Sequence, residues 1–317
     1  MPATQSFDTP AARRAARTAT AHALLIAGLA AACTGGSTTA DPTPAAPATA
    51  IVAVSAGATD TPLSAPDALG TQRAAGQLPT FVRQFGASGI ADGQLQLPTG
   101  IAVDASGNVY VADSVGVQVF DAQGKFARRV AEGDLVSVDG LAVSPDGTKL
   151  YVAERTPPVR VFDASGAAAG TVGAVGEEPG QLSQPAALAL DADGNLYVAD
   201  AANGRVEVYG PNGAHQRTIG EKGGARGQFT QPRALTVGPD GRLYVGVGDS
   251  YAIQVFSPEG VYERSIAHSY KDETMFRIGG LALDNAGRLY ATEAASHYIQ
   301  VFDANGWVND LGQLGSA

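Results

Sequence analysis

The stretch LALDADGNLYVAD at residues 188–200 decides the fold of this chain, because four similar stretches accompany it. The copies are IAVDASGNVYVAD at 101–113, LAVSPDGTKLYVAE at 141–154, LTVGPDGRLYVGV at 235–247 and LALDNAGRLYATE at 281–293. Each copy joins two apolar runs through a glycine-containing turn of the kind that closes a β-hairpin. The tyrosine of the second run recurs at Tyr110, Tyr151, Tyr197, Tyr244 and Tyr290, so the repeat is 41 to 47 residues long.

A second marker follows each copy and supplies a third strand. It reads VQVFD at 117–121, VRVFD at 159–163, VEVYG at 206–210, IQVFS at 253–257 and IQVFD at 299–303. A further turn leads to a more polar run, which we expect to be the outer strand, at 126–130, 168–172, 216–219, 262–266 and 307–311. Four strands at this period are typical of a β-propeller blade, and the repeat leaves no room for crossover helices.

The repeats predict an all-β chain, a β-propeller of four-stranded antiparallel blades. Five complete repeats give five blades, and residues 81–85 read as one additional outer strand ahead of them. A sixth blade is the alternative, and it would require an irregular unit from residues 51–85.

The repeats resemble the NHL family of propellers. The residues that carry the resemblance are the Gly-Gln-Leu/Phe-x-x-Pro entries at 93–98, 180–185 and 227–232, and the run DAANGRV at 200–206. The resemblance covers residues 81 to about 312. Repeat two lacks the entry, and repeat four has Val247 where an acid is expected. A WD-repeat reading fails because Trp307, the only tryptophan, precedes Val308.

The N-terminus reads as an export signal, which we place at residues 1–32. Arg13, Arg14 and Arg17 precede an uncharged stretch at 18–32, which is shorter than the ~20 residues that span a bilayer as a helix. Cys33, the only cysteine of the chain, follows this stretch, and together with the small residues before it resembles a bacterial lipobox in which that thiol is acylated. An ordinary cleavage site is the alternative. We expect an extracytoplasmic protein, anchored to the membrane by lipid on Cys33.

Residues 33–79 read as a disordered tether, and residues 80–317 as the propeller. Ala, Thr, Pro, Gly and Ser dominate the tether, which contains no aromatic residue. Such a segment buries too little apolar surface to offset its ordering entropy. Residues 51–54 (IVAV) are its only strand-like fragment, either an extra strand or an apolar part of the linker, and we favour the linker.

The composition excludes several classes of protein. The formal net charge of −10 argues against nucleic-acid binding and against electrostatic docking on anionic membranes. One cysteine excludes a disulfide framework and a cysteine-based zinc site. No nucleophile elbow, phosphate loop or HExxH motif is present, so we expect no cofactor, and we expect a monomer.

Acids follow the repeated tyrosine by three residues in four repeats. They are Asp113, Glu154, Asp200 and Glu293. A cation-binding ring is one reading, similar to the carboxylate-lined channel of gluconolactonase-like propellers. We favour a structural role instead, in which each acid accepts hydrogen bonds from its own strand-connecting turn and Asp200 pairs with Arg205. The run at 191–195 (DADGN) resembles the start of a calcium loop but lacks the closing Glu, so we expect a hairpin turn.

A metal held by histidines, as in amidating lyases, is not expected here. The histidines beyond the export signal are His215, His268 and His297, and their positions in the repeats do not bring them together.

The loops that join the second to the third strand, and the outer strand to the next blade, share one face of a propeller. Candidate ligand-binding residues in these loops are Arg233, Asp249, Tyr251, Tyr270, His297 and Tyr298. Tyr and Arg are enriched at binding hot spots. We therefore predict binding of a protein, a peptide or an envelope glycan. A metal-dependent hydrolase or lyase acting in the central channel is the alternative, and enzymatic activity stays open.

Overall fold

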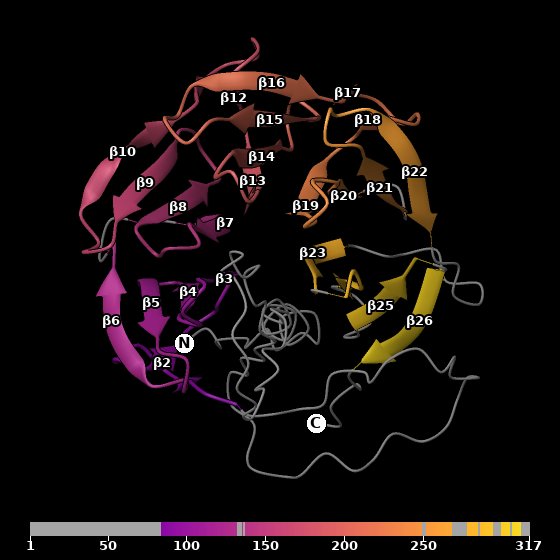
Figure 1. The fold of residues 1–317 in the computed structure, drawn as a ribbon. Coiled ribbons are helices and arrows are strands. Elements are labelled where there is room, and N and C mark those ends of the chain that lie inside the picture. Colours follow the sequence, from indigo (N-terminus) through magenta and orange to yellow (C-terminus); the bar gives the residue numbers. More distant parts are fainter. Residues whose placement is uncertain are drawn as a thin grey trace, which may run out of the picture.

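The computed structural model describes residues 84–131, 135, 137–248, 252–267, 278–284, 286–293, 299–304 and 306–311. Within them the chain forms five four-stranded antiparallel sheets, each a blade. The blades follow one another around a ring, so the predicted five-bladed propeller is confirmed (Figure 1). The export signal, Cys33 and the predicted tether lie outside the described residues.

The strands take the order expected from the repeats. Blade 1 has β3 (Gly100–Val103), β4 (Val109–Asp113), β5 (Gly116–Phe120) and β6 (Phe126–Val130). Blade 2 has β7 (Val138–Val143), β8 (Lys149–Glu154), β9 (Val159–Asp163) and β10 (Ala168–Val172). Blade 3 has β13 (Pro185–Leu190), β14 (Leu196–Asp200), β15 (Arg205–Tyr209) and β16 (His215–Ile219). Blade 4 has β19 (Pro232–Val237), β20 (Leu243–Val247), β21 (Ala252–Phe256) and β22 (Tyr262–Ala267), and blade 5 has β23 (Ile278–Leu283), β24 (Leu289–Glu293), β25 (Ile299–Asp303) and β26 (Gly306–Leu311).

Three short parallel pairs of strands precede blades 1, 3 and 4. They are β1 (Ala87–Ser88) with β2 (Gln94–Leu95), β11 (Ala174–Val175) with β12 (Gln181–Leu182), and β17 (Glu221–Lys222) with β18 (Gln228–Phe229). These are the repeats that carry the Gly-Gln-Leu/Phe entry. We call residues 86–95, 173–182 and 220–229 the entry loops.

The hairpin turns are fixed by their own side chains. In blade 3 the Asp191 carboxylate accepts hydrogen bonds from the Asp193 and Asn195 amides and from the Asn195 side chain. The Tyr197 hydroxyl donates to the same carboxylate at 3.3 Å. Gly194 adopts φ +79°, a conformation that L side chains rarely adopt. Residues 191–195 therefore form the turn between β13 and β14.

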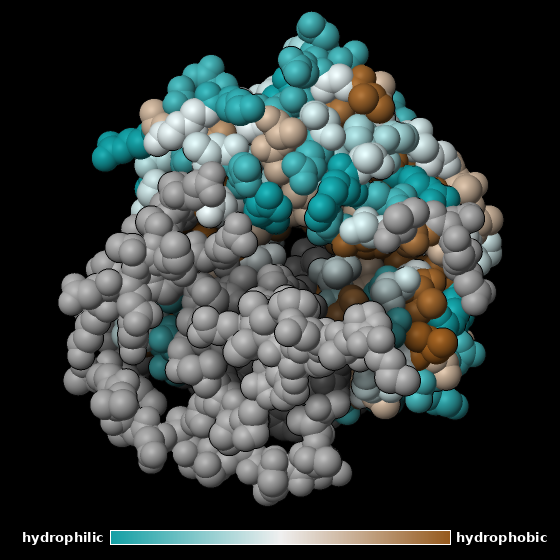
Figure 2. All heavy atoms as spheres, turned by 180° about the vertical axis from the view of Figure 1, so that it is seen from behind, coloured by the Kyte–Doolittle hydropathy of each residue, from teal (hydrophilic) through white to brown (hydrophobic). Residues whose placement is uncertain are grey.

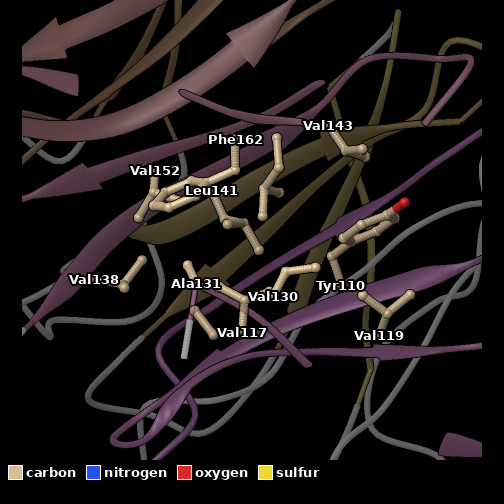
Figure 3. Close-up of a cluster of buried hydrophobic side chains, with 12 residues drawn as sticks. Tyr110, Val117, Val119, Val130, Ala131, Val138, Leu141, Val143, Val152 and Phe162 are labelled. Carbon is tan, nitrogen blue, oxygen red and sulfur yellow. The ribbon is translucent and has the colours of Figure 1, made fainter. Parts of the chain in front are cut away.

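Apolar packing between neighbouring blades forms the core. The second and third strands are buried on both faces, as in β4, β5 and β14, whereas the outer strand β16 is largely exposed. Figure 3 shows one junction, where side chains of blade 1 face those of blade 2. Its labelled residues are Tyr110, Val117, Val119, Val130, Ala131, Val138, Leu141, Val143, Val152 and Phe162. Burying each large aliphatic side chain contributes about 1.5–3 kcal/mol.

On the face of the ring seen from behind, the described residues that are visible are mixed, with apolar patches among hydrophilic residues (Figure 2). In the part of the chain that the structure describes, no helix is long and apolar enough to cross a membrane.

Candidate functional site

The entry loops and the loops between second and third strands meet on one face of the ring, which we call the loop face. The Asp200 carboxylate, at the end of β14, accepts hydrogen bonds from the Ser183 and Gln184 amides, which follow an entry loop. Asn203 donates to Asp200 at 2.7 Å and to the Gly176 carbonyl at 2.9 Å. Side chains after β14 therefore hold the loop that enters the same blade.

Asp113 has the same position in blade 1 and the same role. Its carboxylate accepts hydrogen bonds from the Gln96 and Val115 amides and from the Gln118 side chain. Asp113 is 5% exposed and Asp200 is 0% exposed, so both carboxylates use their oxygens within the fold. A buried carboxylate requires this degree of hydrogen bonding.

A buried glutamine holds the entry loop in blades 1 and 4. Gln118 accepts a hydrogen bond from the Gly93 amide at 2.9 Å and donates to the Gln94 carbonyl. Gln254 accepts from the Gly227 amide and donates to the Gln228 carbonyl, both at 2.8 Å. Two buried bonds per loop fix its backbone against the third strand of its blade.

Blade 3 replaces this glutamine with a charged group that the sequence analysis did not single out. Glu207 stands at the equivalent position with its side chain fully buried, and Arg205 Nε lies 2.7 Å from Glu207 Oε1. Glu207 Oε2 contacts His215 Nε2 and accepts a hydrogen bond from Thr218, each at 2.7 Å. The signal in the sequence was Glu207 in VEVY where the other repeats have Gln or Arg.

Arg205, Glu207 and His215, which we call the group around Glu207, are connected with the entry loop at residues 173–182. The Arg205 guanidinium donates to the carbonyls of Glu177, Glu178 and Gln181 at 2.6 to 3.0 Å. The Tyr209 hydroxyl donates to the Gly180 carbonyl at 3.1 Å. Burial, and then the charge of Glu207, raise the pKa of Tyr209 well above its ordinary value, which keeps this donor protonated.

The three strand-end acids whose side chains the structure describes, Asp113, Glu154 and Asp200, do not form one group. Asp200 has Asn203 as its side-chain partner rather than Arg205, which contacts Glu207. Glu154 Oε2 lies 3.6 Å from Arg160 Nη1. The side chain of Glu293 lies outside the described part of the chain. Within the described ranges, no three His, Cys, Asp or Glu side chains gather as a metal site would require.

One of the candidate ligand-binding residues can be placed. Arg233 lies in β19 with an exposed side chain, and its Nη2 donates to Gln231 Oε1 at 2.9 Å. The other five, Asp249, Tyr251, Tyr270, His297 and Tyr298, lie outside the described residues.

Exposed aliphatic side chains occur on the loop face, and the sequence analysis missed them. Ile90 and Val175 belong to two entry loops and are 61% and 70% exposed. Leu97 follows the first entry loop, is 52% exposed and has φ +50°, a conformation that costs a leucine about 1–2 kcal/mol. Strain of this kind concentrates at functional sites.

The innermost strands of the ring are apolar. Strands β3, β7, β13, β19 and β23 carry two charged residues, Asp139 and Arg233, each the second residue of its strand. Asp139 Oδ2 lies 3.6 Å from Arg155 Nε, and the Arg155 side chain is 69% exposed. The remaining positions are occupied mainly by Gly, Ala, Val, Ile and Leu.

A protein-family comparison finds NHL repeats in this chain. The family model described as NHL repeat matches residues 95–120 and 182–209, which lie in blades 1 and 3 and their entry loops. A search of curated proteins finds no match.

Solved structures with a similar fold show the architecture. A nidogen/laminin complex matches with a TM-score of 0.59 and 16% identity, over 69% of this chain and 81% of that chain. A Bacteroides caccae protein of unknown function has a TM-score of 0.51 and 17% identity, over 67% of this chain and 81% of that one. A streptogramin B lyase has a TM-score of 0.52 and 16% identity, over 68% of each chain.

Replacing Asp200 tests whether this acid serves the loop or a cation. Asp200→Ala should lower the free energy of unfolding by about 2–4 kcal/mol, because buried amides lose a charged acceptor. The control Asp193→Ala, in an exposed turn, should stay within about 0.5 kcal/mol of the wild type. Thermal unfolding with and without 1 mM Ca²⁺ checks this, and a calcium-dependent stabilisation lost in Asp200→Ala would contradict the reading.

Proposed function

Because the chain is an NHL-repeat β-propeller, we propose that it is a binding protein, held outside the cytoplasm by a lipid on Cys33. It recognises a protein, peptide or envelope glycan through the loop face. The observation that carries this proposal is the exposure of Ile90, Leu97 and Val175 on a face whose loops are otherwise clamped.

The clamped loops favour binding because they are already ordered before a ligand arrives. Gln118, Gln254 and the group around Glu207 each fix an entry loop through buried hydrogen bonds. The free-energy cost of ordering these loops on association is therefore small. Aliphatic side chains presented on such a frame favour a protein or peptide within the proposed ligand classes.

The alternative is a metal-dependent hydrolase or lyase in the channel. Its support in the sequence is the set of acids Asp113, Glu154, Asp200 and Glu293. The carboxylates of Asp113 and Asp200 already accept hydrogen bonds from the backbone amides of Gln96 and Gln184. Elemental analysis of the purified mature chain decides between the two classes, because a stoichiometric metal that resists chelation favours the enzyme.

The loop-face proposal predicts that charges at its exposed aliphatic positions abolish capture. The full chain is immobilised, an envelope extract is passed over it, and the retained species are identified by mass spectrometry. Ile90→Asp combined with Val175→Asp should lose the retained species without a fall in melting temperature, since both side chains are exposed. Tyr251→Ala combined with Tyr298→Ala should also lose the retained species without a fall in melting temperature.

The matched control is Val261→Asp. Val261 is 64% exposed in the turn between β21 and β22, which lies at the opposite end of the blade from the loop face. This variant should retain the same species as the wild type. Equal loss in Val261→Asp, or undiminished capture by the loop-face variants, would contradict the proposal.

The lipid anchor has its own test. Cys33→Ser should move the chain from the membrane fraction to the soluble fraction, because two acyl chains on one cysteine suffice for stable anchoring. Mass spectrometry of the mature N-terminus reports the acyl mass on Cys33 directly. A wild-type chain that is cleaved and carries no lipid would show an ordinary signal peptide.

A further inference from the structure

Two neighbouring entry loops carry charges of opposite sign on the loop face. The entry loop of blade 3 carries Glu177 and Glu178, and both residues are exposed. The entry loop of blade 4 carries Lys222 and Arg226, which are also exposed. The strands β12 and β17 of these two loops lie on either side of blade 3 (Figure 1).

One turn of blade 3 connects the two loops into a continuous surface. Asn203 Nδ2 donates to the Gly176 carbonyl of the first loop at 2.9 Å. The Lys222 ammonium of the second loop donates to the Ala202 carbonyl at 3.1 Å. A Cβ added at Gly204 would lie 2.9 Å from Lys222 Cα, so the second loop also packs on this turn. The residues that this surface presents, which we call the two-sign patch, are Val175, Glu177, Glu178, Lys222 and Arg226.

The charges of the two-sign patch are not neutralised by their surroundings. Among the described residues, none of its four charged side chains forms an ion pair. Glu221, the one acid beside Lys222, accepts a hydrogen bond from the Gln228 side chain at 2.8 Å. In the entry loop of blade 1, by contrast, Asp92 Oδ1 lies 2.8 Å from Arg129 Nε. The two-sign patch therefore keeps charges of both signs available for a partner.

The patch also presents an aliphatic side chain on an ordered backbone. Val175 is 70% exposed and precedes the two acids in the same loop. The Gln181 side chain accepts a hydrogen bond from the Glu178 amide, and the Gln228 side chain accepts one from the Ala225 amide, both at 3.1 Å. These bonds order both loops before a partner arrives, which lowers the entropic cost of association.

A surface with both signs side by side restricts which partners fit. Nucleic acid, an anionic membrane and a polybasic peptide each carry one sign, so one half of the patch attracts them and the other half repels them. A second copy of the chain, rotated by half a turn, places its basic loop opposite the acidic loop and its acidic loop opposite the basic one. Twofold interfaces are self-complementary in this way, so a second copy satisfies the charges of both loops.

We propose that the two-sign patch joins two copies of the chain into a twofold dimer. The contact between an acidic and a basic loop occurs twice in this dimer, and each copy contributes its exposed Val175. The proposal rests on the proposed function, because it uses the loop face for recognition and names a second copy as a protein bound there. It departs from the monomer expected from the sequence. Ile90 and Leu97 belong to the entrance of blade 1, outside the patch, and stay available for a further ligand.

Sedimentation velocity of residues 33–317 tests the proposal, with Cys33→Ser included so that no lipid brings copies together. The unchanged patch should dimerise with a dissociation constant of about 10–100 μM, because exposed ion pairs are individually weak. Glu177→Lys with Glu178→Lys makes the patch basic, and Lys222→Glu with Arg226→Glu makes it acidic. Each variant alone should raise the dissociation constant at least about tenfold, because like charges then face each other.

An equimolar mixture of the basic and acidic variants provides the decisive comparison. Both of its loop contacts join opposite charges, so the mixture should dimerise within about threefold of the unchanged patch. Recovery in the mixture also shows that both variants fold. A mixture that stays monomeric overturns the proposal, as does an unchanged patch that stays monomeric at about 200 μM, above the expected constant.

The matched control is Asp193→Lys with Glu259→Lys, which changes the net charge as much as the basic variant does. Asp193 and Glu259 are exposed in turns at the opposite end of the blades from the loop face. This control should dimerise like the unchanged patch, and equal weakening in the control overturns the proposal. The result is independent of capture from an envelope extract: a monomer that still captures its species overturns the dimer and leaves the binding function standing.

Discussion

The structure depends on the packing of one blade's apolar face against the next. Strands such as β4, β5 and β14 are buried on both faces, so a blade cannot satisfy its side chains alone. Adjacent blades supply that cover at four junctions, each with its own cluster of Val, Leu, Tyr or Phe side chains. At the junction between blades 5 and 1, the described side chains form one cluster within blade 1 and its entry loop and one within blade 5.

The loop face follows from the way each blade is entered. Gln118 and Gln254 form hydrogen bonds with backbone groups of the entry loops, and Asp113 and Asp200 accept hydrogen bonds from amides that directly follow an entry loop. These residues make a stiff frame, which leaves recognition to the side chains it displays, notably Ile90, Leu97 and Val175. Function is therefore proposed for the surface of the ring, whereas the innermost strands contribute mainly small and aliphatic residues.

The sequence predicted the fold because five tandem copies repeat the same alternation of strands and turns. It also predicted that residues 191–195 form a turn. It did not predict the group of Arg205, Glu207 and His215, because Arg205 finds carbonyl partners 24 to 28 residues earlier in the chain. The strain at Leu97 was likewise hidden, since residues 184 and 231 occupy the equivalent place without a positive φ.

Hydrogen exchange on the mature full chain tests the central claim, that every blade face is covered by a neighbouring blade. The account predicts that amides of β4, β5 and β25, next to the junction between blades 5 and 1, exchange as slowly as those of β14 and β15 in the middle of the described chain. Exchange orders of magnitude faster in β4, β5 and β25 than in β14 and β15 would contradict it, because it would show that these faces open to water independently of the rest of the ring.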